Sequence, residues 1–236
     1  LGAALVAPLF YILVSKLSAI FQADWLVYLA QKPLYQYIDR LRIAGFICII
    51  PYLLKTTQVK WQSLALKINL KAYTRGFLRG CFLWTFLLLC IVLATHKLQM
   101  RSNWHLSIFK AFSASLLLAF IEELIFRGFI FEFLRKKHSI HKSSALLAFL
   151  FAVLHFSLCN EGKTNNLPVF LQSLQCAWYS LTSIWGNIHW PYFFSLIFLS
   201  KILAALRLYY NSLWAAIGFH QGLVFTLMSI RQVFLF

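Results

Sequence analysis

Two adjacent carboxylates and a guanidinium interrupt an otherwise apolar run between residues 111 and 134. They belong to Glu122, Glu123 and Arg127. A charged residue at the centre of a membrane helix costs roughly 3 kcal/mol on insertion scales, so three of them cost on the order of 9 kcal/mol. The chain has only six acidic residues, and the placement of two of them here indicates a functional site.

The spacing of these three residues predicts different roles for the two acids. Glu123 precedes Arg127 by four residues, which is the favourable order for an ion pair on one helix face. Glu122 points about 100° away around the helix axis. We expect Arg127 to neutralise Glu123 and Glu122 to face a cavity. The alternative is a purely structural network between helices, which we favour less because buried ion pairs stabilise poorly compared with apolar packing.

Two isolated histidines, His155 and His220, lie in other apolar runs. A lone histidine on an apolar face is usually a hydrogen-bonded core residue. If two antiparallel helices meet at Ser139, however, Glu122 lies 17 positions before the turn and His155 lies 16 after it, at nearly the same depth. Two such histidines and a double glutamate, all within the membrane, favour a shared polar cavity.

These residue types suit hydrolysis of an amide bond by an activated water. The reaction needs a general base for the water and hydrogen-bond donors for the developing oxyanion. The sequence has no serine or cysteine nucleophile in a recognisable motif and no H-E-x-x-H zinc motif. Glu122, His155 and His220 would suit a two-histidine, one-carboxylate metal site. We disfavour a divalent metal and expect no cofactor.

The composition predicts a membrane protein. Hydrophobic residues make up 61% of the 236 residues and charged residues only 12%, against about 25% in a typical soluble domain. The net charge of +16 comes from lysines and arginines that lie mostly between apolar blocks, as the positive-inside rule describes. We therefore expect the lipid bilayer as a partner and no nucleic acid, since no motif for nucleic-acid binding accompanies the charge.

The apolar blocks predict an all-α, polytopic membrane helical bundle with seven or eight spans. The basic segment 55–79 reads equally as a helix on the membrane surface and as a solvated loop, and with segment 135–142 it would face the cytoplasm. Residues 160–191 form an additional span or a re-entrant or surface element. The expected spans cover about residues 3–21, 43–54, 77–95, 111–134, 143–158, 192–206 and 213–233.

The polar residues within the spans resemble the three motifs of the CPBP family of intramembrane proteases, which includes the type II CAAX prenyl endopeptidases. The first motif is Glu122-Glu123-x-x-x-Arg127 with the following Gly128, the second is Phe151-x-x-x-His155, and the third is His220. The stretch from Ser212 to His220 also looks like the family. The resemblance covers about half of the chain and implies N-terminal membrane spans over residues 1–106 and a protease core over residues 107–236.

By this resemblance, the chain is an intramembrane endopeptidase that cuts membrane-associated proteins or peptides, and Glu122, Glu123, Arg127, His155 and His220 form its catalytic site. The residues matching Glu122 and His155 activate a water, and the one matching His220 stabilises the oxyanion. The family usually has Asn or Asp four residues after this histidine, where this chain has Val224. Gln221 is too near His220 in sequence to share its helix face.

The resemblance implies an integral protein of the cytoplasmic membrane of a bacterium. Two other functions remain open on the sequence alone. One is a non-catalytic binding or immunity protein of the same fold, which Val224 favours. The other is a transporter or proton relay, which would call for more polar residues in the other spans.

Overall fold

The computed structural model describes residues 2–34, 64–95, 99–100, 104–155, 168–175 and 190–235, isolated positions between 36 and 55, and residue 178. The described part is all-helical apart from one two-residue strand pair, β1 (Gln99–Met100) with β2 (Phe234–Leu235), so the predicted all-α class is confirmed. Most of the 160–191 segment lies outside the described residues. Among the described residues, two helices, Trp190–Tyr210 and Leu213–Ile230, are long and apolar enough to cross a membrane by length and composition.

The chain divides into two compact units, which we describe separately. The first comprises residues 1–52 and 149–197 and contains α1 (Gly2–Phe21) and α2 (Asp24–Ala30). Its α1 packs through Ala7 against Tyr37 and Ile38, and the Tyr37 hydroxyl donates a hydrogen bond to the Leu29 carbonyl at 2.9 Å. This burial explains why the first apolar block forms a helix that the sequence already predicts.

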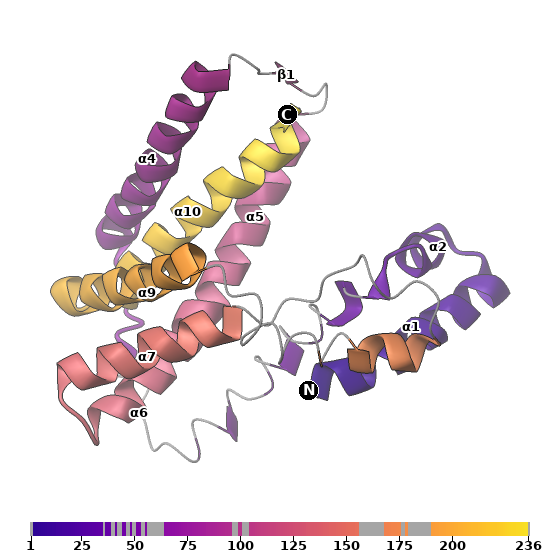
Figure 1. Ribbon diagram of the computed structural model, residues 1–236, viewed down its shortest axis with the longest axis horizontal. Helices are drawn as coiled ribbons and strands as arrows, with labels where there is room; N and C mark the ends of the chain where they lie inside the picture. The colour runs from indigo at the N-terminus through magenta and orange to yellow at the C-terminus, as the bar shows by residue number, and fades with distance from the viewer. Residues whose placement is uncertain are drawn as a thin grey trace. The chain divides into compact units, whose positions relative to one another are not determined.

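The second unit, residues 53–148 and 198–236, contains most of the predicted site. Its long helices are α4 (Leu70–Thr95), α5 (Trp104–Glu123) and α10 (Leu213–Val233), and α10 lies alongside both α4 and α5 (Figure 1). A π-helix, η2 (Leu124–Ile130), continues α5 and leads into α6 (Phe131–Arg135). Helices α7 (Ile140–His155) and α9 (Trp190–Tyr210) run from one unit into the other.

Helix α4 begins at Leu70, so the prediction of a separate surface helix or loop over residues 55–79 is wrong for its last ten positions. The reason is a stripe of small buried residues, Ala72, Gly76 and Gly80, spaced by four. The basic residues of this segment alternate with the stripe on the exposed side of the same helix, where long cationic side chains remain solvated. They are Lys71, Arg75 and Arg79.

Helices α4 and α10 meet through glycines on both sides. A Cβ on Gly218 or Gly222 of α10 would run into the backbone carbonyl oxygen of Tyr73 or Phe77 on α4, and Gly76 and Gly80 are covered by the α10 backbone in the same way. Small residues spaced by four let two membrane helices approach closely and pack by van der Waals contact. The glycines therefore fix the position of α10, which carries His220.

Gly222→Ala is expected to lower the stability of the protein by about 1–3 kcal/mol, because the added methyl group has no room against the α4 backbone. The measurement is thermal unfolding of purified protein in detergent, followed by circular dichroism. The matched control is Gly128→Ala, whose Cβ would lie 3.4 Å from Leu124 Cδ1 and 3.6 Å from Leu64 Cδ2. Equal melting temperatures for the two variants would contradict the role assigned to the α4–α10 contact.

Candidate active site

The candidate site lies where α5 passes into η2. Glu122 and Glu123 are the last two residues of α5, and Arg127 lies in η2. A π turn bonds i to i+5 and accommodates one residue more than an α turn, and single π segments are frequent at functional sites. Here the π segment buries Leu124 to Phe129 without interruption, so the charged group Arg127 points into the protein rather than to the surface.

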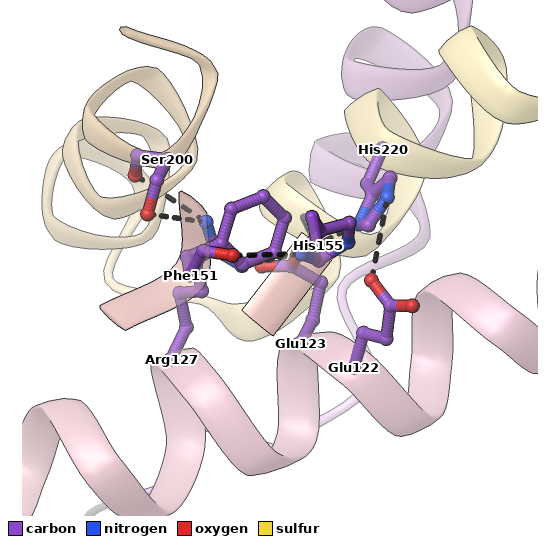
Figure 2. A network of polar contacts seen from close by, with 7 residues as sticks. All are labelled: Glu122, Glu123, Arg127, Phe151, His155, Ser200 and His220. Atoms are coloured by element: carbon purple, nitrogen blue, oxygen red, sulfur yellow. Dashed lines mark hydrogen bonds and ion pairs between the residues drawn. The ribbon is translucent and has the colours of Figure 1, made fainter. Parts of the chain in front are cut away.

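Arg127 and Glu123 form the predicted ion pair. Arg127 Nη1 donates to Glu123 Oε1 at 2.9 Å, and neither side chain has any exposed surface. Arg127 Nη2 also donates to Ser200 Oγ at 2.9 Å, which ties η2 to α9 (Figure 2). A buried guanidinium is tolerated only when it is paired and hydrogen-bonded. The pair therefore organises three helical segments around Glu123.

His220 reaches from α10 to both glutamates. Its Nδ1 donates to Glu123 Oε1 at 2.8 Å, and its Nε2 lies 3.8 Å from Glu122 Oε2 (Figure 2). Because the carboxylate oxygen accepts, the hydrogen of this bond is on Nδ1. The second distance is too long for a direct hydrogen bond, and a polar contact of this length suits a bridging water. The structure thus brings four of the five predicted residues together: Glu122, Glu123, Arg127 and His220.

The two adjacent glutamates have unlike surroundings. Glu123 has no exposed surface, and its Oε1 accepts from both Arg127 and His220. Glu122 keeps 17% of its side chain exposed and faces the Nε2 side of His220. The acid held by two donors is suited to positioning, whereas the partly exposed acid is suited to contact with water or substrate.

His155 lies at the end of α7, in the first unit. Its Nδ1 donates to the Phe151 carbonyl oxygen at 2.8 Å, and the two rings are tilted by 34° with their centroids 4.0 Å apart. A backbone carbonyl only accepts, so a neutral imidazole here has its lone pair on Nε2. Phe151 of the second motif therefore orients His155. The expected approach of His155 to Glu122 stays a prediction, because the two units are described separately.

Sequence reasoning missed the partners that come from distant helices. Ser200 is 73 residues from Arg127, and the only signal for it is a polar pair, Ser200-Lys201, within the apolar run 192–206. A second missed partner is Arg207, whose Nη2 lies 2.8 Å from Glu132 Oε1, while Arg135 Nη1 lies 3.2 Å from the same oxygen. This second cluster joins α6 to α9 and is separate from the glutamate pair.

Within the part of the chain that the structure describes, no group of three His, Cys, Asp or Glu side chains could hold a metal ion. The expected absence of a metal and a cofactor stays a prediction.

A family model for Type II CAAX prenyl endopeptidase Rce1-like proteins matches residues 103–226, slightly more than half of the chain. The chain belongs to this family. No curated protein and no solved structure matched the sequence. The matched segment of this Rce1-like protein begins just before α5, contains all five predicted site residues and excludes α4. Membership in this family of CAAX protease-type endopeptidases, together with the apolar helices, identifies an integral membrane protein.

Proposed function

We propose that this Rce1-like protein is an intramembrane endopeptidase that hydrolyses peptide bonds of membrane-associated proteins or peptides by means of a water activated by Glu122 and His155. The family match supports the peptidase class. The observation that supports the chemistry is the position of His220 between the two glutamates. Its Nδ1 is hydrogen-bonded to Glu123, whereas its Nε2 faces Glu122, the acid that can contact water.

In this proposal Glu122 is the general base. It takes a proton from the water as the water oxygen attacks the carbonyl carbon of the substrate, and His155 orients that water or donates a proton to the leaving amine. His220 donates from Nε2 to the developing oxyanion. Glu123 and Arg127 position His220 through the hydrogen bond to its Nδ1.

The charges of the cluster are consistent with these roles. Counted as formal charges, two glutamates and one guanidinium sum to minus one, and a net charge in a buried cluster is costly. A protonated His220 makes the cluster neutral. It also supplies an N–H at Nε2 for the oxyanion while Glu122 remains ionised and able to accept a proton.

We further propose that the protein crosses the cytoplasmic membrane of a bacterium seven or eight times. The apolar helices α9 and α10 are two of these spans, and the remaining apolar blocks supply the others. Cysteine-scanning with a membrane-impermeant reagent tests this topology. The proposal expects the reagent to label only cysteines placed in the connections between the apolar blocks. Each connection should be labelled from one side of the membrane only.

The test of the enzymatic proposal uses purified protein in proteoliposomes and two internally quenched peptides with the same CAAX sequence, one of them farnesylated. Cleavage of either peptide by the wild-type protein, with a single cut identified by mass spectrometry, is the expected result. The Glu122→Ala protein should cut neither peptide. Full cleavage by this variant would show that another group activates the water.

A second candidate function is non-catalytic binding, for example in self-immunity, by a protein of the same fold. The observation that favours it is Val224, a side chain without a hydrogen-bond donor one helical turn after His220. In that case neither peptide is cut, and the cellular phenotype of the wild-type gene is unchanged by Glu122→Ala.

A further inference from the structure

One face of α10 packs against both α4 and α5, along the line where these two helices are adjacent to it. Two aromatic residues on this face, Trp214 and Phe225, each contact both neighbouring helices. The ring centroid of Trp214 lies 6.2 Å from Tyr73 of α4 and 6.0 Å from Phe120 of α5. The centroid of Phe225 lies 5.8 Å from Phe77 of α4 and 5.7 Å from Phe112 of α5.

Gln221 lies on the same face, between these two aromatic layers. It follows Trp214 by seven residues and precedes Phe225 by four, the spacings that align side chains on one side of a helix. Its side chain has no exposed surface. A carboxamide is an unusual occupant of an aromatic seam, because each of its polar atoms needs a partner.

Only half of this carboxamide is satisfied. The Tyr73 hydroxyl donates to Gln221 Oε1 at 2.5 Å, and the NH₂ group is the other end of the carboxamide. Nε2 has no hydrogen-bond partner among the residues that the structure describes. A buried pair of N–H donors without an acceptor is costly, so it calls for a ligand oxygen.

The position of His220, the preceding residue, indicates which ligand oxygen this would be. His220 directs its Nε2 towards Glu122, and Gln221 lies about 100° further around the axis of α10. As the sequence predicts, Gln221 does not share the face of His220, so two donors would approach one acceptor from two directions. The residue one turn after His220, Val224, has no donor to offer.

We propose that Gln221 is the second hydrogen-bond donor to the carbonyl oxygen of the scissile peptide bond, and that Tyr73 of α4 is the residue that positions it. This inference rests on the proposed endopeptidase function. As water adds to the carbonyl carbon, the C=O π electrons move to oxygen, and His220 and Gln221 donate to that oxyanion. Its collapse re-forms the C=O bond and breaks the C–N bond, and the nitrogen leaves as an amine with the proton that Glu122 took from the water, delivered directly or through His155.

The experiment compares kcat and KM for the farnesylated CAAX peptide. Gln221→Leu keeps the volume but removes the donors, and it should lower kcat by roughly 10²- to 10³-fold, as loss of one oxyanion donor does. KM should change little. Adding Val224→Asn to that variant should restore most of kcat, and Tyr73→Phe should cause a smaller fall in kcat alone. The matched control is Thr226→Val, which removes a hydroxyl bonded to the Gly222 carbonyl of the same helix and should leave kcat unchanged.

Each result decides the inference. Wild-type kcat in the Gln221→Leu protein would overturn it and leave the proposed function intact, provided that Glu122→Ala is inactive. A fall that accompanies a lower melting temperature and is not restored by Val224→Asn would show that Gln221 only supports the fold. A wild-type protein that cuts neither peptide would overturn the proposed function, and this inference with it.

Discussion

Glu122→Gln is expected to lower kcat for peptide cleavage by roughly 10²- to 10⁴-fold, the contribution typical of a general base. Glutamine has nearly the same shape but a carboxamide cannot take a proton from water. Because Glu122 is partly exposed and the ion pair of Glu123 with Arg127 is retained, the variant should fold and melt like the wild type. The measurements are steady-state cleavage of the farnesylated CAAX peptide and thermal unfolding in detergent.

The control for this experiment is the adjacent acid. Glu123→Gln makes the same chemical change one residue later, but it removes the carboxylate that pairs with the buried guanidinium of Arg127. This variant should lose stability as well as activity. If both variants lost stability equally, the division between a catalytic Glu122 and a positioning Glu123 would be wrong. If Glu122→Gln kept wild-type kcat, the general base would have to be another group.

Arg127→Met is expected to lower the free energy of unfolding by about 3–5 kcal/mol, because the fully buried carboxylate of Glu123 loses its ion pair with the guanidinium. It also removes the donor that ties η2 to Ser200 of α9. A loss of this size corresponds to a fall in melting temperature of roughly 10 °C for a protein of this length. Circular dichroism of purified protein in detergent measures it.

The double variant Arg127→Met, Glu123→Gln separates the effect of charge from that of packing. With both charges removed, the amide oxygen of the new side chain can still accept from His220 Nδ1, so much of the lost stability should return. Replacement of a buried ion pair by neutral groups is often close to neutral in stability. A double variant that melts below Arg127→Met would show that the pair matters through its shape rather than its charge.

The sequence predicts those features that depend only on residues within one helix. The ion pair of Glu123 with Arg127 follows from a spacing of four, and the helical ranges of α1, α9 and α10 follow from long apolar blocks. The sequence predicts the start of α4 too late, because the charged residues of its first turns indicate a surface segment. On this helix they alternate with a buried stripe of small residues, and a hydropathy block alone does not reveal that stripe.

Contacts between distant helices could not be predicted in this way. Nothing in the periodicity of α9 or α10 tells which neighbour each face will meet, so Ser200 and the bond from His220 to Glu123 appear only in the structure. The π segment also could not be predicted from residue spacing. The sequence offers only Gly128 as a weak local sign of the π turn.

The glycine contacts between α4 and α10 limit how much of the N-terminal part can be removed from a recombinant form of this protein. A recombinant fragment restricted to residues 103–226 would retain every acid and imidazole of the catalytic cluster. It would nevertheless leave the groove of Gly218 and Gly222 open to lipid tails or to another fragment, because the helix that fills it begins at Leu70. Expression boundaries should therefore start upstream of Leu64, whose side chain is also fully buried.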